Sequence, residues 1–495
     1  MADRYKKFIR SVVKDILLTT INAKWIHPSL ALRLLKANLG ALEDRCEIIE
    51  FAHRQPLNEK LEPLLAARPK ILGISVSIWN HSATLELLAN LANEWAAQTD
   101  KRRKPVMVLG GPEVSHLPRG AVIFRYADYV ISGEGEEAFR SLCEKIIACE
   151  KQTPEYHTEI RNREKDTVFI TAPEVDLSVI KNAYYLYTDE DIAKKLIYVE
   201  ASRGCPFNCE FCLSAVKSSR ASTVREYPLE QFFSQMDTLV NRGVRTFKFL
   251  DRTFNLNIPR ALKIITFFLE KIEESKEPFM VHFEMVPSLF PPELLDALTL
   301  FPPDTLRLEI GVQTLNADVS LRIGRPACGE PELNTIRFLR EKTNAIIHLD
   351  LIAGLPGEDL ESFGEGFDHL WLALSETGFT HTNIEIQPGI LKLLPGAPIA
   401  RHNADFNMRY NTEPPYEVLE TSCMTTKDIA RIKNFARFWE LLVNRDLIGL
   451  TLDSPVFRRF LDLSDYLKIH FGRNYGIDKY ELLEIALNYL SKSGN

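Results

Sequence analysis

Between Asp15 and about residue 150, short apolar segments alternate along the chain with stretches whose apolar residues recur every three or four positions. The first pattern is typical of buried strands and the second of amphipathic helices. The expected strands are Ile16–Thr20, Glu47–Phe51, Ile71–Val76, Val106–Leu109 and Tyr129–Ile131, and the expected helices include Ser29–Leu39 and Ala83–Ala97. This alternation predicts a doubly wound, Rossmann-like parallel sheet.

A second series of the same kind runs from Lys195 to about Ile399. Its expected strands are Leu196–Glu200, Thr246–Leu250, Met280–Met285, Leu306–Val312, Ala345–Ile352 and Thr382–Gln387. The chain then becomes helical, with apolar residues at helical spacing. The helices expected there are Lys427–Asn444, Ser454–Phe471 and Asp478–Leu490.

These patterns divide the chain into five segments. Residues 1–14 are an N-terminal extension, residues 15–150 the first α/β domain, and residues 195–400 the second. The polar, proline-containing residues between them, 151–194, are interpreted as a linker. Residues 401–495 form a mainly helical C-terminal domain.

The composition is that of a soluble globular protein of two or three domains, with 495 residues, 45% hydrophobic and 26% charged. The formal net charge of −7 argues against broad nucleic-acid binding, which needs a basic surface. No run of eighteen apolar residues predicts a membrane span, and the N-terminus lacks a secretory signal pattern. Eight cysteines are too sparse for a disulfide scaffold, so a reducing, cytoplasmic location is expected.

Three cysteines follow the first strand of the second series on one short loop, Cys205, Cys209 and Cys212. Three thiolates are one short of the four that close a structural zinc site or an iron–sulfur cube. An incomplete ligand set leaves one position free for another molecule, which is what chemistry at a metal needs. The alternatives are a zinc site completed by a distant histidine, or buried thiols with no ligand role.

The order Cys-x-x-x-Cys-x-x-Cys, with Phe211 before the last cysteine, resembles the radical S-adenosylmethionine (SAM) superfamily. The resemblance implies that the three thiolates bind three irons of a [4Fe–4S] cluster and that SAM binds the fourth. It also implies that Phe211 lies near the adenine and that residues 195–400 form a partial (β/α)6 barrel. In a barrel of parallel strands the functional residues lie at the carboxyl ends of the strands.

Polar residues and glycines occupy those ends in this sequence. Asp251 follows the second strand, where the family binds the methionine amino group; a helix N-cap or turn role is an equal alternative. Glu309 and Gln313 alternate onto one face of the fourth strand and are implied to reach the ribose or the substrate. Gly354, in Gly-Leu-Pro-Gly-Glu, is implied to let the adenine approach closely, or else to form a tight turn.

Other residues of this domain carry less specific signals. Arg322 and Arg325 follow the fourth strand, and either could hold a carboxylate of cofactor or substrate. His282 and Glu284 share one face of the third strand, where a charged group needs a partner or a ligand. Outside the triad, Cys328 and Cys423 are candidates for hydrogen-atom donation or plain unpaired thiols.

In the first domain, glycines, hydroxyls and carboxylates gather at the ends of the expected strands, where ligands of doubly wound sheets bind. These candidates are Thr20, Ser75, Ser77, Gly110, Gly111, Glu113, Gly133 and Glu134. Gly-Gly-Pro-Glu, followed by a strand and Gly-Glu-Gly-Glu, resembles the cobalamin-binding domain found ahead of many radical SAM enzymes. The Asp-x-His-x-x-Gly signature of a cobalt-ligating histidine is absent. The resemblance therefore implies an axial ligand that is water, another side chain such as His27, His81 or His116, or nothing.

Together these resemblances imply a cobalamin-dependent radical SAM enzyme that reductively cleaves SAM to a 5′-deoxyadenosyl radical. The expected reaction is methylation of an unactivated carbon of an unidentified small molecule, with a one-electron reductant such as flavodoxin or ferredoxin. The alternatives are a radical enzyme that oxidises, cyclises or rearranges its substrate without methylation, and a cobalamin-sensing binding protein.

Overall fold

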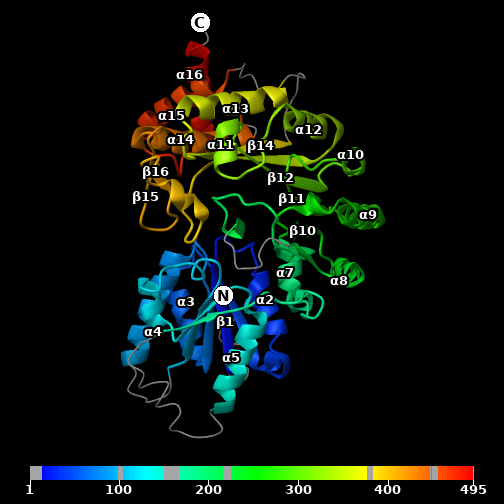
Figure 1. Cartoon of the computed structure of the whole chain (residues 1–495), viewed down its shortest axis with the longest axis vertical. Coiled ribbons are helices and arrows are strands. Elements are labelled where there is room, and N and C mark those ends of the chain that lie inside the picture. Colours follow the sequence, from blue (N-terminus) through cyan, green and yellow to red (C-terminus); the bar gives the residue numbers. More distant parts are fainter. Residues whose placement is uncertain are drawn as a thin grey trace. The chain divides into compact units, whose positions relative to one another are not determined.

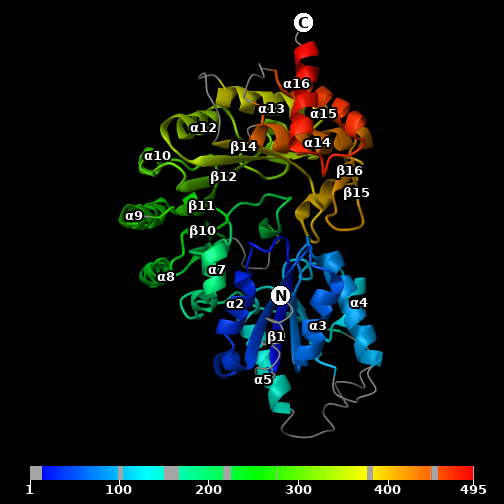
Figure 2. The ribbon, with the colours of Figure 1, turned by 180° about the vertical axis from the view of Figure 1, so that it is seen from behind.

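The computed structural model describes residues 14–97, 104–149, 167–215, 224–275, 277–375, 383–445, 447–448 and 455–493. The expected N-terminal extension lies outside them except for Lys14, as do residues 151–166 of the expected linker. The chain divides into two compact units. The first comprises Met1–Val199 and Glu226–Val244, and the second comprises Glu200–Arg225 and Arg245–Asn495. Figures 1 and 2 label the elements of both.

A six-stranded parallel sheet in the order β2-β1-β3-β4-β5-β6 forms the centre of the first unit. Its strands are β1 (Ile16–Asn22), β2 (Cys46–Ala52), β3 (Ile71–Ser75), β4 (Val106–Gly110), β5 (Tyr129–Ser132) and β6 (Val168–Thr171). All five strands expected in this region are confirmed. Strand β6 was missed; it lies in the segment expected to be a linker, which therefore contributes to the sheet.

Helices cover both faces of this sheet (Figures 1 and 2). They are α2 (Leu30–Ala37), α3 (Leu57–Ala67), α4 (His81–Ala97) and α5 (Gly135–Cys149). One buried cluster joins Leu64 of α3 and Leu88 of α4 to the sheet, and a second joins Leu32 of α2 and Phe139 of α5 to its other face. Burial of apolar residues on both faces explains the near-continuous apolar strands and confirms the doubly wound architecture.

The first unit also contains α7 (Asp189–Lys194) and α8 (Leu229–Asn241), together with the 3-10 turns Gly40–Arg45, Val122–Tyr126 and Tyr184–Leu186. Helix α7 begins at Thr188, whose hydroxyl accepts a hydrogen bond from the Asp191 amide while the Asp191 carboxylate accepts one from the Thr188 amide. This reciprocal pair is a capping box, which fixes where the helix starts. The end of the expected linker is thus ordered by its own polar residues.

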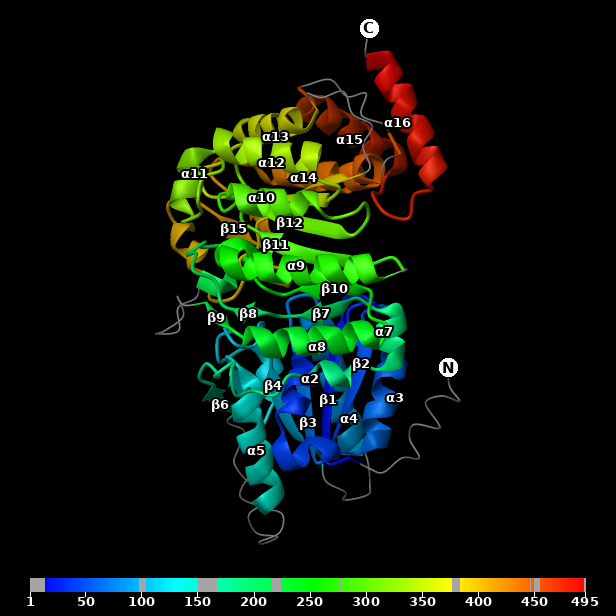
Figure 3. The same ribbon diagram turned by 90° about the vertical axis from the view of Figure 1, so that its right-hand side faces the viewer.

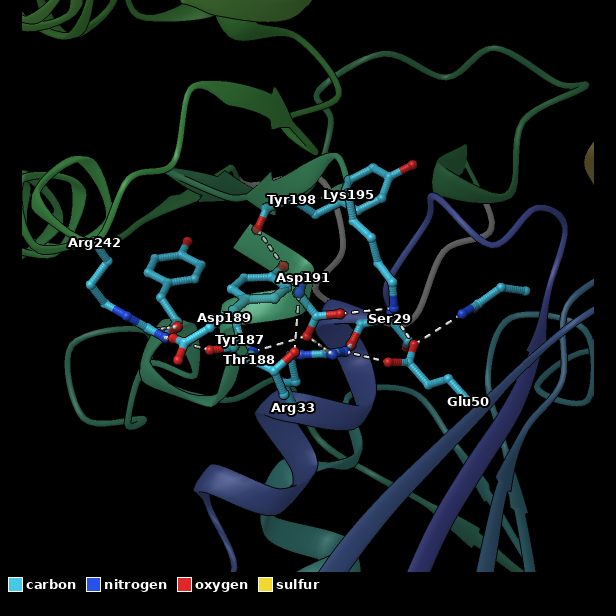
Figure 4. Close-up of polar contacts among 12 residues, drawn as sticks. Ser29, Arg33, Glu50, Tyr187, Thr188, Asp189, Asp191, Lys195, Tyr198 and Arg242 are labelled. Carbon is cyan, nitrogen blue, oxygen red and sulfur yellow. Dashed lines mark hydrogen bonds and ion pairs between the residues drawn. The ribbon is translucent and has the colours of Figure 1, made fainter. Parts of the chain in front are cut away.

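A buried ion network holds α7 against α2 and β2 (Figure 4). The Arg33 guanidinium lies 2.8 Å from Glu50 and 2.8 Å from Asp191, and the three side chains are at most 10% exposed. Lys195 lies 2.8 Å from Asp191, and Arg33 lies over the ring of buried Tyr187. Burial alone would raise the pKa of Asp191, but Arg33 and Lys195 hold it below its usual value. Removing one member of such a network strongly destabilises the fold, because a charge is then left buried without its partner.

The second unit is built on parallel strands in the order β14-β13-β12-β11-β10. They are β10 (Thr246–Phe249), β11 (Met280–Met285), β12 (Leu306–Gln313), β13 (Ile346–Ala353) and β14 (Ile384–Ile390). The remaining expected strand forms as β7 (Ile197–Val199), so all six are confirmed, although Thr382 itself lies outside the described residues. Short strands β8 (Ser202–Arg203) and β9 (Arg225–Glu226), and β15 (Arg409–Tyr410) and β16 (Val418–Glu420), form two small separate pairs.

Helices α9 (Ile258–Glu274), α10 (Pro292–Thr299) and α12 (Glu330–Lys342) lie side by side along the strands of this unit (Figure 3). The unit's other helices are α11 (Ala317–Arg322), α13 (Leu360–Ser375), α14 (Thr426–Trp439), α15 (Phe457–Phe471) and α16 (Lys479–Ser493). The 3-10 turns are Leu213–Ala215, Phe254–Leu256 and η6 (Pro398–His402), and a π-helical turn, Glu440–Asn444, continues α14. Among the described helices, none is long and apolar enough to cross a bilayer.

The three expected C-terminal helices are confirmed; α14 and α15 pack against α13, and α16 packs against α15. Phe367 of α13 meets Phe435 and Trp439 of α14 edge-on, with ring centroids 5.0 and 4.8 Å apart. All three rings are fully buried. The C-terminal helices therefore share a core with the second series of strands and helices.

Replacing Arg33 by Met should lower the free energy of unfolding of the first unit by about 3 kcal/mol, because Glu50 and Asp191 stay buried after losing their shared cation. Amide hydrogen exchange of peptides from β1 and β2 measures this. Lys181→Met is the matched control, since Lys181 pairs with Glu43 at an exposed site and should cost less than about 1 kcal/mol. Equal amide protection in the Arg33→Met and Lys181→Met variants would contradict the conclusion that the buried network stabilises the first unit more than the exposed pair does.

Candidate functional site

The three cysteines of the triad occupy one loop at the start of the second unit. Cys209 is buried, with 5% of its surface exposed, whereas Cys205 and Cys212 are partly exposed. The pKa of the Cys209 thiol is raised, mainly by burial. The Arg325 guanidinium opposes this shift, and the neighbouring Cys212 and Cys205 add to it. The three sulfurs therefore lie near enough to influence one another electrostatically.

The donor set distinguishes between metals. In the part of the chain that the structure describes, no group of three or more His, Cys, Asp or Glu side chains is arranged to hold a single metal ion. A zinc site needs about four such ligands converging on one ion. Cluster thiolates each bind a separate iron, so they need not converge on one point. Three free thiols on one loop are the donor set that an iron–sulfur cube with one open corner needs.

Contacts from distant parts of the second unit fix the loop. Glu210, between two of the cysteines, accepts hydrogen bonds from Arg401 Nε at 3.0 Å, and its carboxylate lies 2.9 Å from His402 Nε2. Its carbonyl accepts from the Ile399 amide at 3.0 Å, and its own amide donates to the Ile323 carbonyl at 2.9 Å. Glu210, Arg401 and His402 were not predicted from the sequence, because nothing in their spacing signals a contact across about 190 residues.

Asp251 anchors the start of the same loop. Its carboxylate accepts from the Ala201 amide at 2.9 Å and from the Ser202 hydroxyl at 2.5 Å. The side chain is buried, and burial raises its pKa to about 7. Since both oxygens are engaged, the structure favours the turn role over binding of the methionine amino group; the latter stays a prediction. Thr253 contacts the cluster loop as well, with its hydroxyl 3.7 Å from Cys205 Sγ.

The strands of the second unit have one apolar face and one polar face. Apolar residues such as Phe247, Phe283, Leu308 and Leu349 are fully buried on one face. The alternate positions carry Lys248, His282, Glu284, Arg307, Glu309, His348, Asp350, Glu385 and Gln387. Helices cover the apolar face, so the polar row is the inner surface of the partial barrel.

Glu309 is the centre of the polar face. Its carboxylate lies 3.2 Å from Lys248 Nζ and 3.1 Å from His282 Nε2. Hydrogen bonding from His282 lowers the pKa of Glu309 to about 2, which overcomes the opposing effect of burial. His282 and Glu284 lie on the same face of β11, as predicted, because they alternate with the buried residues Val281, Phe283 and Met285. Glu309 is an anion at neutral pH and lies beside Lys248 and His282.

Two other carboxyl groups on this face have raised pKa values. Burial, followed by the neighbouring charges of Glu309 and Glu284, raises the pKa of Asp350 to about 7. Burial also raises the pKa of Glu284. His348 packs against His282 with ring centroids 6.3 Å apart, and burial lowers its pKa to about 3. Charge on the inner surface is thus sensitive to what occupies it.

The fourth strand ends in an irregular turn. The register with β13 shifts between Gly311 and Gln313, and Gln313 has a φ of +71°. Its amide therefore turns toward Gly311, beside the Arg325 guanidinium. Strained backbone of this kind is common in binding sites. Phe211 of the cysteine loop is partly buried.

Arg322 and Gly354 are engaged within the protein. Arg322 donates to the Pro356 carbonyl at 2.7 Å and lies over the ring of Phe406, 4.9 Å from its centroid. Gly354 has a φ of +84°, and a Cβ there would lie 2.5 Å from Val418 Cγ1. These contacts favour a tight turn at Gly354, packed by the C-terminal region.

The candidates of the first unit lie together at the carboxyl edge of its sheet. Thr20 Oγ1 donates to the Ser75 carbonyl at 2.9 Å, and Asn80 links Ser77 to Thr20. Gly111 and Gly133 pass close to neighbouring backbone, whereas a Cβ at Gly110 would make only ordinary contact, 3.6 Å from the Ile131 carbonyl oxygen. At Gly111 (φ +102°), a Cβ would lie 2.5 Å from the Val76 carbonyl oxygen. Glycine is thus required at Gly111 and Gly133.

Both acidic candidates of this edge, and the histidines His27 and His81, have protein partners. The buried Glu113 carboxylate lies 2.8 Å from His81 Nδ1, and Glu134 accepts from the Val175 amide at 2.8 Å. His27 Nδ1 lies 2.8 Å from the Tyr198 hydroxyl. Burial lowers the pKa of His116.

Exposed aromatic and apolar side chains lie at the same edge, and they were not predicted from the sequence. Trp25 and Trp79 are 47% and 54% exposed, and Ile26 is 42% exposed. Trp25 and Ile26 follow β1, and Trp79 follows β3. Large apolar groups exposed at the carboxyl edge of a doubly wound sheet, where ligands of such sheets bind, are typical of a binding surface.

Three family models match the chain. Residues 199–370 match the radical SAM superfamily, residues 16–143 match the B12 binding domain, and residues 404–474 match a protein family of unknown function, DUF4080. The first two matches confirm the resemblances inferred from the cysteine loop and from the glycine motifs. They also confirm the expected [4Fe–4S] cluster, SAM and cobalamin as the cofactors of these domains.

Curated relatives include two methyltransferases. The chain is 26% identical over 350 residues to 2-(S-pantetheinyl)-carbapenam-3-carboxylate methyltransferase of Streptantibioticus cattleyicolor, covering 67% of this chain and 48% of the relative. It is 24% identical over 361 residues to the cobalamin-dependent radical SAM methyltransferase TokK of Streptomyces tokunonensis, covering 70% and 50%. The matched region thus spans about half the length of these relatives.

Solved structures share the fold. The cobalamin-dependent SAM radical enzyme OxsB, with aqua-cobalamin and SAM bound, aligns with a TM-score of 0.64 at 14% identity, covering 98% of this chain and 79% of that one. The radical SAM methyltransferase TsrM from Kitasatospora setae, with tryptophan and a SAM analogue bound, aligns with a TM-score of 0.58 at 18% identity, covering 81% and 80%. These likenesses confirm the predicted fold class.

Replacing Asp350 by Asn should stabilise the protein at pH 8 by ~2 kcal/mol and change its stability little near pH 4. The Asp350 carboxyl ionises near pH 4 when unfolded but at about 7 when folded, so stability falls as pH rises between these values. Hydrogen exchange of β13 peptides at the two pH values measures this. The exposed Asp296→Asn is the control, and an equal effect of Asp350→Asn at both pH values would contradict the assignment.

Proposed function

Because the chain combines a radical SAM domain with a B12-binding domain, we propose that it is a cobalamin-dependent radical SAM methyltransferase acting on a small molecule. When bound, the cluster and SAM supply one-electron cleavage to a carbon radical, and cobalamin supplies the methyl group. The observation that carries the proposal is a loop with three thiols, matched to this superfamily, in a chain that also has a B12-binding domain.

In this proposal the residues of the loop position the open iron. Cys205, Cys209 and Cys212 would hold the cluster by three of its irons, and SAM would bind the remaining one. Glu210 holds the loop against η6, and Asp251 holds its start. Rigid support of this kind keeps the ligands in place and limits access of water.

The polar inner surface of the second unit orients SAM and substrate. Glu309 is an anion held by Lys248 and His282, and it offers acceptor oxygens to hydroxyl or ammonium groups. Gln313 adds an amide at the irregular end of the same strand. Asp350 can hold or release a proton near neutral pH. A surface with this mixture suits a polar small molecule.

The carboxyl edge of the first sheet holds cobalamin in this proposal. Gly110, Gly111 and Gly133 let backbone approach the cofactor, and Thr20, Ser75 and Ser77 line the same edge. Trp25 and Trp79 offer exposed apolar surface to the corrin ring. Glu113 and Glu134 support the loops through their own hydrogen bonds. A one-electron reductant such as flavodoxin or ferredoxin is part of the proposal, because the first step consumes an electron.

Replacing Cys209 by Ala should abolish cluster assembly and 5′-deoxyadenosine formation, since two thiolates cannot hold three irons. Iron, sulfide and cobalt contents of the anaerobically reconstituted full chain, followed by product analysis with dithionite and SAM, measure this. Cobalt content should persist, because the B12-binding residues lie in the other unit. Cys423→Ala, at an exposed cysteine outside the loop, should keep its full iron and sulfide content.

The same preparations separate the proposal from its alternatives. Transfer of a labelled methyl group from SAM to a product supports methylation. Deoxyadenosine without methylated product supports a non-methylating radical reaction. Full cluster and cobalt loading without deoxyadenosine would favour a cobalamin-sensing protein and contradict the proposal.

A further inference from the structure

We propose that Arg325 donates a hydrogen bond to the Cys209 sulfur in the cluster-loaded protein and thereby raises the reduction potential of the cluster. The inference rests on the proposed function, because it requires the cluster. It assigns Arg325 to the cluster, whereas the sequence left it as one of two candidates for holding a carboxylate. Arg325 is then a residue that adjusts the reduction potential of the cluster by acting on one of its ligands, Cys209.

The contact itself is specific. Arg325 Nη1 lies 3.5 Å from Cys209 Sγ, within hydrogen-bond reach of a sulfur acceptor. The second terminal nitrogen, Nη2, donates to the Gly311 carbonyl at 2.5 Å. The two terminal nitrogens of the guanidinium therefore have different acceptors, the Cys209 sulfur and the Gly311 carbonyl at the end of β12. These two acceptors fix the plane of the guanidinium.

Backbone contacts lock the two partners together. The Glu210 amide donates to the Ile323 carbonyl at 2.9 Å, and the Arg325 amide donates to the Ser320 carbonyl at 2.9 Å. Gly324 has a φ of +65°, and a Cβ there would lie 2.8 Å from the Asn208 carbonyl oxygen. The residues on either side of Cys209 and the residues before Arg325 are thus held against each other by contacts within the protein.

The strand end also makes room for the guanidinium. A Cβ at Gly311 would lie 3.1 Å from Arg325 Nη2 and would also collide with the Gln313 amide. Glycine at this position of β12 therefore allows Arg325 to reach past the strand toward Cys209.

Arg322, only three residues earlier, provides the contrast. It donates to the Pro356 carbonyl and stacks over Phe406, and no contact between Arg322 and a cysteine sulfur is found among the described residues. Two arginines in one segment thus have separate partners, and one of them is a cluster thiol.

The direction of the effect follows from charge. Reduction adds one electron, and part of the added negative charge resides on the sulfurs. A fixed guanidinium stabilises that charge more than it stabilises the oxidised cluster, and hydrogen bonds to sulfur are among the known determinants of cluster potential. Cys209 is 95% buried, with 5% exposed, so solvent screens the interaction little.

The test is an anaerobic, EPR-monitored redox titration of the reconstituted full chain without SAM. Arg325→Met should lower the equilibrium constant for one-electron reduction about tenfold, a fall of ~59 mV in midpoint potential. Arg325→Lys, which keeps the charge, should recover part of the loss. Arg322→Met is the matched control and should leave the potential at the wild-type value.

The outcomes separate cleanly. An unchanged potential in Arg325→Met with weakened SAM binding would overturn the inference in favour of a carboxylate-binding role. Equal shifts in Arg325→Met and Arg322→Met would overturn it in favour of a general charge effect. If Arg325→Met does not load its cluster, the comparison passes to Arg325→Gln and Arg325→Lys. Failure of the wild-type chain to assemble any cluster contradicts the proposed function itself.

Discussion

Three thiolates can bind an iron–sulfur cube at three of its corners. In the proposed function, the corner without a protein ligand would be where SAM binds. A fourth side chain would convert the site into a closed electron carrier or a structural metal. The protein must therefore hold three sulfurs firmly while offering nothing to the fourth iron. The contacts around the loop meet this requirement by holding the three cysteines in place.

The loop is short, and its own sequence cannot hold it rigid. Glu210 is held by Arg401 and His402 from a segment almost two hundred residues later, and its backbone bonds to Ile323 and Ile399. The turn η6 is thus part of the support for the cluster loop, and it belongs to the same compact unit as the barrel strands. Rigid outer-shell contacts of this kind are as much a part of a metal site as its ligands.

Local patterns determined most of what could be predicted. The strands form where apolar runs occur, because burial on both faces of a parallel sheet demands them. The triad was recognisable because its three residues lie within eight positions of one another. Strand β6 was missed since Val168–Thr171 is short and lies in a polar surrounding, and only its pairing with β5 shows it to be a strand.

The support of the site was beyond prediction for a different reason. Glu210, Arg401 and His402 are ordinary polar residues until the fold brings them together. Asp251 illustrates the same limit, because its carboxylate is engaged by Ala201 and Ser202 across fifty residues. Spacing along the chain reveals ligands that act as a local group, whereas long-range hydrogen bonds appear only in three dimensions.

The vacant corner is tested most directly by EPR spectroscopy of the reduced, anaerobically reconstituted protein before and after SAM is added. Direct binding of the sulfonium compound to the fourth iron predicts a clear change in the g values of the cluster signal. A spectrum that stays the same at saturating SAM, or a preparation that contains zinc in place of iron, would contradict the account.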